Sequence, residues 1–135
     1  MWNHEEVIET SAPAARVWEL FADVARWKSW NAGIETCEIH GPFKTGTPLT
    51  MTPPGQNALH STLIEVIPGQ SFTDETVVDE TRVVVYHQLI SLPSGNTRII
   101  YRTEITGPAA AELGPMVASD FADVLASLKN LAESS

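Results

Sequence analysis

Hydrophobic and polar residues alternate along the middle of the chain with a period of two, which is typical of β-strands that bury one face. Gly, Pro, Asn and Asp residues, which favour turns, separate the alternating segments. Six such segments cover residues 34–41, 47–52, 59–67, 71–78, 82–92 and 97–106, and residues 2–9 form a looser seventh. The short connections predict that consecutive strands are antiparallel neighbours.

Helical patterns flank these strands. Two short helices are expected after the first strand, one from Pro13 to near Asp23 and one that carries Trp27 and Trp30 and stops at Gly33. A longer helix is expected over residues 113–132, because its apolar residues recur at helical spacing. That stripe consists of Val117, Phe121, Val124, Leu128 and Leu131.

The order of these elements predicts a single α+β domain over residues 1–135. A helix with one apolar stripe must bury it, and the concave face of a curved antiparallel sheet offers the surface. A strongly twisted sheet wrapped around one long C-terminal helix seldom fills completely. The pattern therefore predicts a cavity between sheet and helix, and Phe121 on the stripe is expected to face it.

Composition narrows the classes of partner. The 135 residues carry a net charge of −9, which disfavours nucleic acids and anionic membrane surfaces. No stretch has the length and apolarity of a membrane span, and the acidic N-terminus, MWNHEEVIET, does not resemble a signal peptide. With one cysteine, Cys37, no disulfide can form within the chain. These features favour a cytoplasmic protein without membrane insertion, and a homodimer stays open.

The chain shows no pattern for a metal or cofactor. The four histidines, His4, His40, His60 and His87, lie on separate segments without metal-ligand spacing, so we expect no metal and no cofactor. The sequence also contains no nucleophile elbow and no Gly-rich phosphate loop. We interpret Cys37, within a predicted strand, as a small buried thiol rather than a nucleophile.

Several stretches together resemble the polyketide cyclase/dehydratase-like branch of the START-like (SRPBCC) superfamily. They are SAPAARVWELFADVARWKSWNAGIE, EVIPGQSF, SLPSGNTRIIYRTEIT and the GP before the last helix. The resemblance implies a helix-grip fold around a deep, mostly apolar cavity. Family members bind lipids, sterols, polyketides or plant hormones, some close or dehydrate aromatic rings, and others activate chaperones. The resemblance also places Trp30 beside the mouth of the cavity and makes Trp27 a packing residue.

The last strand shows which of its residues face the cavity. One face presents Ile99, Tyr101, Thr103 and Ile105, and the other presents mainly charged residues. The apolar face must point inward, so the hydroxyl of Tyr101 is offered to the cavity. Tyr101 is either a ligand-binding or catalytic polar group or an aromatic wall with a local hydrogen-bond partner.

The inward face of the preceding strand depends on the loop near PSGN. An even loop places Gln88 opposite Tyr101, whereas an odd loop places Leu89 opposite Tyr101 and His87 inside, opposite Thr103. We favour the odd loop, which the resemblance also implies. His87 could then act as an acid or base near pH 7, or serve as a hydrogen-bonded cavity residue.

The remaining polar candidates are weaker. His60 is a candidate ligand-binding residue, although neither face of its strand is clearly the apolar one. Asp74 and Glu75 could supply a carboxylate to the site, but an exposed strand edge is the usual place for such residues and is the one we expect. Asp120 borders the helix stripe and is expected on a solvated flank.

Three functions fit the sequence. The first is the binding of a small hydrophobic or aromatic molecule, with Trp30, His60, His87, Tyr101 and Phe121 as candidate contacts. The second is a cyclase or dehydratase that uses the same cavity with His87 and Tyr101 as catalytic groups. The third is a protein–protein adaptor whose pocket is vestigial.

Overall fold

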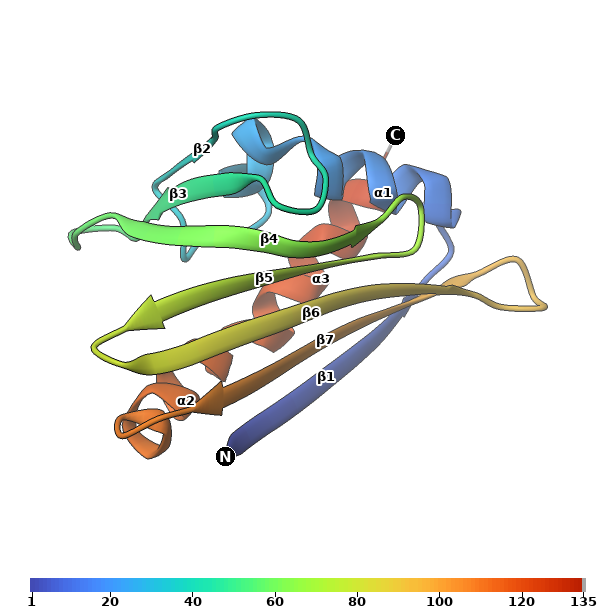
Figure 1. The fold of residues 1–135 in the computed structure, drawn as a ribbon. Coiled ribbons are helices and arrows are strands. Elements are labelled where there is room, and N and C mark those ends of the chain that lie inside the picture. Colours follow the sequence, from blue (N-terminus) through green and yellow to red (C-terminus); the bar gives the residue numbers. More distant parts are fainter. Residues whose placement is uncertain (135) are drawn as a thin grey trace.

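A seven-stranded antiparallel sheet forms the body of the computed structural model, which describes residues 1–134 (Figure 1). The strands lie in the order β1-β7-β6-β5-β4-β3-β2, so β2 to β7 pair with their neighbours in the chain, while β1 pairs with β7 at the far edge from β2. The strands are β1 (Trp2–Thr10), β2 (Thr36–Ile39), β3 (Pro48–Thr52), β4 (Leu59–Ile67), β5 (Ser71–Val78), β6 (Thr81–Ser91) and β7 (Thr97–Thr106).

The helices cover one face of this sheet. Between β1 and β2 lie α1 (Ala14–Ala22) and the 3-10 helix η1 (Val24–Ser29), and the chain continues after β7 with α2 (Ala110–Ala118) and α3 (Phe121–Glu133). Figure 1 shows α3, in red, running across the sheet, with α1 at the end where β2, β3 and β4 lie. This is the helix-grip arrangement predicted from the order of the elements.

The C-terminal helix differs from the prediction in one respect. It is interrupted at Ser119 and Asp120, where the backbone of Asp120 leaves helical geometry at φ −107° and ψ 2°. The Ser119 hydroxyl donates to the carbonyl of Met116 at 2.9 Å, a local bond that competes with the helical pattern. The buried residues of α3 are Phe121, Val124, Leu125, Leu128 and Ala132, so Leu125 and Ala132 join the predicted stripe and Leu131 is only partly buried.

The β6–β7 hairpin decides which face of β6 points inward. Ser91 pairs with Thr97, so the loop has an odd number of residues, and His87 is buried while Tyr86 is 36% exposed on the other face. The predicted parity is therefore confirmed. The predicted pairing is wrong by two residues, because His87 lies opposite Tyr101 rather than Thr103. The last pair before the loop is Ser91 with Thr97, so the five-residue loop is centred on Ser94, one residue earlier than the predicted register requires.

Strand β4 explains why its apolar face was ambiguous in sequence. Its register against β5 shifts between Leu63 and Glu65, which marks a β-bulge. A bulge adds one residue to one strand and exchanges the faces beyond it. Before the bulge Ser61 and Leu63 are buried, whereas His60 is exposed on the opposite face.

Phe21 of α1 is the centre of the aromatic core. Its side chain is 0% exposed, and its ring lies 5.0 Å from that of Phe72 and 6.0 Å from that of His87, measured between centroids. Trp30 and Tyr101 also lie near it, with centroids at 6.3 and 6.4 Å. The aromatic residues of α1, η1 and the sheet therefore pack as one cluster beside the site described next.

Candidate functional site

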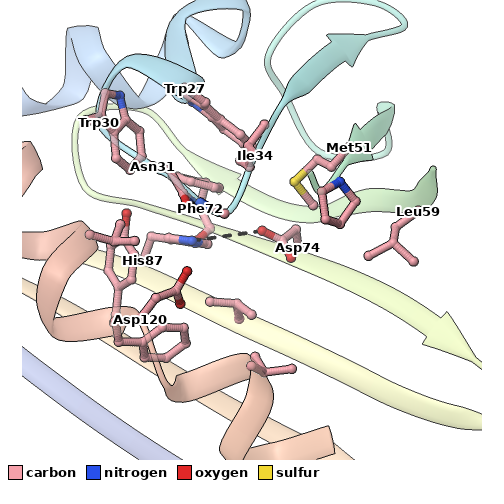
Figure 2. Close-up of a pocket in the computed structure, with 17 residues that line it drawn as sticks. Trp27, Trp30, Asn31, Ile34, Met51, Leu59, Phe72, Asp74, His87 and Asp120 are labelled. Atoms are coloured by element: carbon pink, nitrogen blue, oxygen red, sulfur yellow. Dashed lines mark hydrogen bonds and ion pairs between the residues drawn. The ribbon is translucent and has the colours of Figure 1, made fainter. Parts of the chain in front are cut away.

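A cavity of about 230 Å³ lies between the inner face of the sheet, η1 and the start of α3. Figure 2 draws the 17 residues that line it. They come from η1 and the loop after it, from β3 to β7, and from α2, α3 and the break between them. The inward faces of the strands supply its floor, and the helices close it from the other side.

Trp27 builds one wall of the cavity. Its indole Nε1 donates to the carbonyl of Phe21 at 2.9 Å, and its ring is stacked on Phe72 at 5.6 Å between centroids. This hydrogen bond satisfies the one polar atom of the side chain and fixes the ring. Trp27 is a packed core residue, as expected, and it also lines the cavity.

Trp30 lies beside it, with 6.3 Å between the two ring centroids. It lines the cavity, as the resemblance implies, but it is only 4% exposed and so is not an open rim residue. In Figure 2 the indole nitrogen of Trp30 points away from the cavity, and the six-membered ring faces it. Trp30 therefore contributes apolar surface.

His87 of β6 lies inside, as predicted. Its ring is stacked on Phe72 with 3.9 Å between centroids and 7° between planes. Its Nδ1 lies 3.1 Å from the carbonyl oxygen of Phe72; because a carbonyl only accepts, Nδ1 carries the proton and Nε2 has a free lone pair. Burial lowers the pKa of His87 to about 3, so the imidazole is neutral at physiological pH.

Asp74 of β5 is the main residue that the sequence interpretation misplaced. It is 6% exposed and lines the cavity, with an Oδ2 atom 4.0 Å from Nε2 of His87 (Figure 2). Burial raises the pKa of its carboxyl to about 7. The expectation that Asp74 lies at an exposed strand edge is wrong, because β5 lies between β4 and β6 in the sheet. The alternation with Phe72, two residues earlier, is the signal that could have placed Asp74 inside.

Tyr101 of β7 faces the same cavity and contacts the edge of the His87 ring at 4.6 Å between centroids. Its hydroxyl is buried and has no hydrogen-bond partner within residues 1–134. Burial, together with the nearby carboxyls of Asp74 and Asp120, raises the pKa of Tyr101 well above its usual value. The phenol is therefore a neutral donor that a ligand oxygen or nitrogen could satisfy.

Asp120 and Phe121 lie at the break between α2 and α3. Phe121 lines the cavity, as expected, with its ring edge-on to Tyr101 at 5.6 Å between centroids. Asp120 is half-buried and also lines it, so the expected solvated flank is wrong. Its Oδ2 would lie 2.8 Å from a Cβ at Gly33, which shows how closely the loop after η1 approaches the break. Burial raises the pKa of Asp120.

His60, a predicted contact, does not lie at the cavity. It is exposed on the outer face of β4, where its Nδ1 lies 3.4 Å from Oγ1 of Thr50. The physical reason is the β4 register, which turns Leu59 and Ser61 inward. Cys37 is half-buried in β2, and burial raises the pKa of its thiol to about 12.

Two further features concern metals and membranes. Among residues 1–134, no group of three or more His, Cys, Asp or Glu side chains could hold a metal ion. Over the same described range, no helix combines the length and apolarity needed to cross a membrane.

The arrangement joins an apolar, aromatic cavity to a few polar groups at one side. Asp74 can give or take a proton near neutral pH, His87 offers a lone pair at Nε2, and Tyr101 offers a hydroxyl proton. Such a site can hold a ring and orient one or two polar atoms on it. These groups could also transfer a proton to or from a bound molecule.

Comparison with protein families gives a match over nearly the whole chain. Residues 1–133 match the family described as "Polyketide cyclase / dehydrase and lipid transport". Among curated proteins, no sequence match is found.

Solved structures share the fold at low sequence identity. The ZhuI aromatase/cyclase from Streptomyces sp. R1128 has a TM-score of 0.83 and 16% identity, over 98% of this chain and 93% of that one. Truncated norcoclaurine synthase from Thalictrum flavum has a TM-score of 0.78 and 16% identity, over 99% and 94%. The Aha1 dimer from Colwellia psychrerythraea has a TM-score of 0.76 and 16% identity, over 99% and 98%.

Proposed function

We propose that this chain, which belongs to the polyketide cyclase / dehydrase and lipid transport family, binds a small aromatic molecule in the cavity between its sheet and its C-terminal helices. The observation that carries the proposal is a cavity walled by aromatic rings, one of which is Tyr101, whose buried hydroxyl has no hydrogen-bond partner within residues 1–134. A buried hydroxyl without a partner costs free energy, and a ligand atom would supply that partner.

The size of the cavity supports a ligand of one or two rings. An apolar cavity of about 150 Å³ accepts benzene, and the cavity here measures about 230 Å³. The open space also speaks against the adaptor hypothesis, which requires a pocket filled by its own side chains.

Titration with 2-naphthol, a neutral two-ring phenol, tests the proposal. Binding should quench tryptophan fluorescence because Trp27 and Trp30 line the cavity. Val85→Phe, which adds a ring at the lining, should weaken binding by at least tenfold. Val77→Phe is the matched control, since Val77 is exposed on the neighbouring strand. No quenching by 2-naphthol or by the one-ring probes described below would contradict the proposal.

A cyclase or dehydratase reaction in the same cavity is the second candidate. The observation that favours it is the carboxyl of Asp74, which lies 4.0 Å from Nε2 of His87 in a water-restricted site beside Tyr101. A carboxyl whose pKa is about 7 suits general acid–base chemistry near neutral pH. The solved ZhuI structure, an aromatase/cyclase, shares the fold.

The enzymatic candidate can be tested with heptane-2,4,6-trione, which closes to 3,5-dihydroxytoluene with loss of one water. An enzyme should accelerate this closure, and Asp74→Asn or His87→Gln should slow it on the order of 100-fold. His60→Gln is the control, because His60 lies outside the cavity. A closure rate equal to that in buffer alone would remove this candidate for such substrates while leaving the binding proposal intact.

A further inference from the structure

The lining of the cavity, within residues 1–134, contains acidic side chains but no side chain that is positively charged near neutral pH. Its lining contains two carboxyl side chains, Asp74 and Asp120, and one neutral imidazole, His87. No Lys or Arg belongs to the described lining. A buried carboxyl usually has a basic partner or several donors, so this composition is unusual for a site with no ligand of its own.

Asp74 in particular lacks a donor. Its side chain is 8% exposed, and its Oδ2 lies 4.0 Å from Nε2 of His87, beyond hydrogen-bond distance. Because the proton of His87 is on Nδ1, Nε2 is itself an acceptor and cannot satisfy the carboxylate. Within residues 1–134, Asp74 has no side-chain hydrogen bond. The carboxyl points into the cavity in Figure 2.

Aromatic rings surround the same space. The side chains of Trp27, Trp30, Phe72, Tyr101 and Phe121 line it together with the two carboxyls. The faces of such rings attract a cation, most strongly where water is excluded. Carboxylates and ring faces therefore favour the same ligand charge, and both disfavour an anion.

We propose that the pocket selects an arylalkyl amine, a molecule with an ammonium group on a short alkyl chain attached to an aromatic ring. The ammonium group donates hydrogen bonds to the carboxylate of Asp74 while the ring packs between Trp30, Phe72 and Phe121. The inference rests on the proposed binding function and names the chemical class of the ligand. The lone pair on Nε2 of His87 and the Tyr101 oxygen are further acceptors within the lining. A carboxylic acid of the same shape would instead place its charge against Asp74 and Asp120 without a cationic partner.

Proton binding gives this selectivity a pH dependence. Asp74 has a pKa of about 7, so it gains its charge between pH 6 and pH 8. The groups that face it keep their protonation over this range: His87 is neutral, and the Tyr101 hydroxyl and the Cys37 thiol stay protonated. The pKa of Asp120, at the helix break, is also raised. The variant Asp120→Asn distinguishes its contribution from that of Asp74.

Three probes of nearly equal size test the proposal: 2-phenylethylamine, 2-phenylethanol and phenylacetate. By calorimetry at pH 8, the amine should bind at least tenfold more tightly than the alcohol, and phenylacetate more weakly than both. From pH 8 to pH 6 the amine should weaken by about tenfold, as expected when one carboxylate with this pKa must lose a proton, and the alcohol should not. At pH 6, binding of the amine should release close to one proton, measured in two buffers of different ionisation enthalpy.

Variants assign the effect to one carboxyl. Asp74→Asn, which keeps the shape of the protonated acid, should reduce the ratio of amine to alcohol affinity to near one, and Asp120→Asn should reduce it less. Glu75→Gln is the control, because Glu75 lies on the outer face of β5 in an ion pair with Arg82. If Asp74→Asn does not fold, the proton release measured on the unmodified protein still tests the inference.

The outcomes separate this inference from the function on which it rests. Equal binding of amine and alcohol, or amine binding without proton release at pH 6, overturns the amine inference and leaves a binding pocket. Preferred binding of phenylacetate overturns it as well. No binding of any of these probes or of 2-naphthol overturns both proposals.

Discussion

Two walls of one cavity are built on different principles. One wall, which η1 supplies, consists of aromatic rings that pack against Phe21 of α1 behind them, and Trp27 is held by its bond to the Phe21 carbonyl. The wall of β5 and β6 contains Asp74 and His87, two buried titratable groups with no direct hydrogen bond between them. The first wall contains no titratable group among these residues, whereas the stability of the second depends on protonation.

This difference indicates which wall should determine the stability of the fold and which should determine the choice of ligand. Removing a ring from a packed wall leaves a void, and the cost does not depend on pH. Removing a titratable group from the other wall changes how many protons the folded state binds. Both walls meet at Phe72, which contacts the Trp27 ring on one side and the His87 ring on the other.

The largest expected effect comes from the packed wall. Phe21→Ala should lower the free energy of unfolding by about 3–5 kcal/mol, because Phe21 is fully buried and touches both walls. Urea denaturation at pH 5 and pH 7 measures it, and the loss should be equal at both. Phe43→Ala, at a half-buried ring, should cost clearly less. A loss below 1 kcal/mol at Phe21 would mean that the aromatic cluster is not the packed wall described here.

The titratable wall should give a smaller effect with two opposite signs. The raised pKa of Asp74 stabilises the folded state below the unfolded value near 4, and this stabilisation is lost as pH rises to about 7. The lowered pKa of His87 contributes stability above about 6.5, and this contribution is lost as pH falls to about 3. The two nearly offset each other between pH 4 and pH 6.5.

Single variants should expose each contribution. Relative to the unmodified protein, Asp74→Asn should become more stable as pH rises from 4.5 to 6.5, and His87→Gln less stable, each by about 1 kcal/mol per pH unit. Urea denaturation at three pH values measures both slopes. His60→Gln, outside the cavity, should leave the slope unchanged. Slopes of the same sign for both variants would show that the two groups do not oppose each other.

The smallest expected effect distinguishes the two tryptophans. Trp27→Phe removes the bond to the Phe21 carbonyl and should cost about 1 kcal/mol of stability. Trp30→Phe removes no hydrogen bond within residues 1–134 and should cost less. In fluorescence titrations with 2-naphthol, we expect Trp30→Phe to remove more of the quenching than Trp27→Phe. The reverse order would assign the ligand to the Trp27 side of the cavity.

The sequence predicts the fold and the face of β7 well because both depend on repeated patterns. Tyr101 shares its face with Ile99 and Ile105, so three alternating positions agree on which side is buried. The inward orientation of His87 follows from the odd number of residues in the β6–β7 loop. The position of the first pair after that loop depends on the turn conformation, with Gly95 at φ +92°, and this placed the register two residues from the prediction.

Polar residues in the site were harder to place because their types normally indicate exposure. Asp74 is buried although Asp is rarely buried, and in its strand one strong apolar residue, Phe72, marks the inward face before it. His60 was a candidate because the bulge at Leu63 and Glu65 mixes the two faces of β4. Asp120 reaches the cavity because the helix breaks there, and an apolar spacing that continues across the break cannot reveal it.

The break at Ser119 and Asp120 divides the C-terminal segment into two helices that are anchored in different ways. α3 anchors itself with five buried residues, whereas α2 buries only Gly114, against the indole ring of Trp2. Val117 of α2 and Asp120 lie over the cavity beside the loop that contains Gly33. The C-terminal segment therefore contributes to the molecule in two ways: α3 is part of the core, and α2 supplies Val117 to the lining of the cavity.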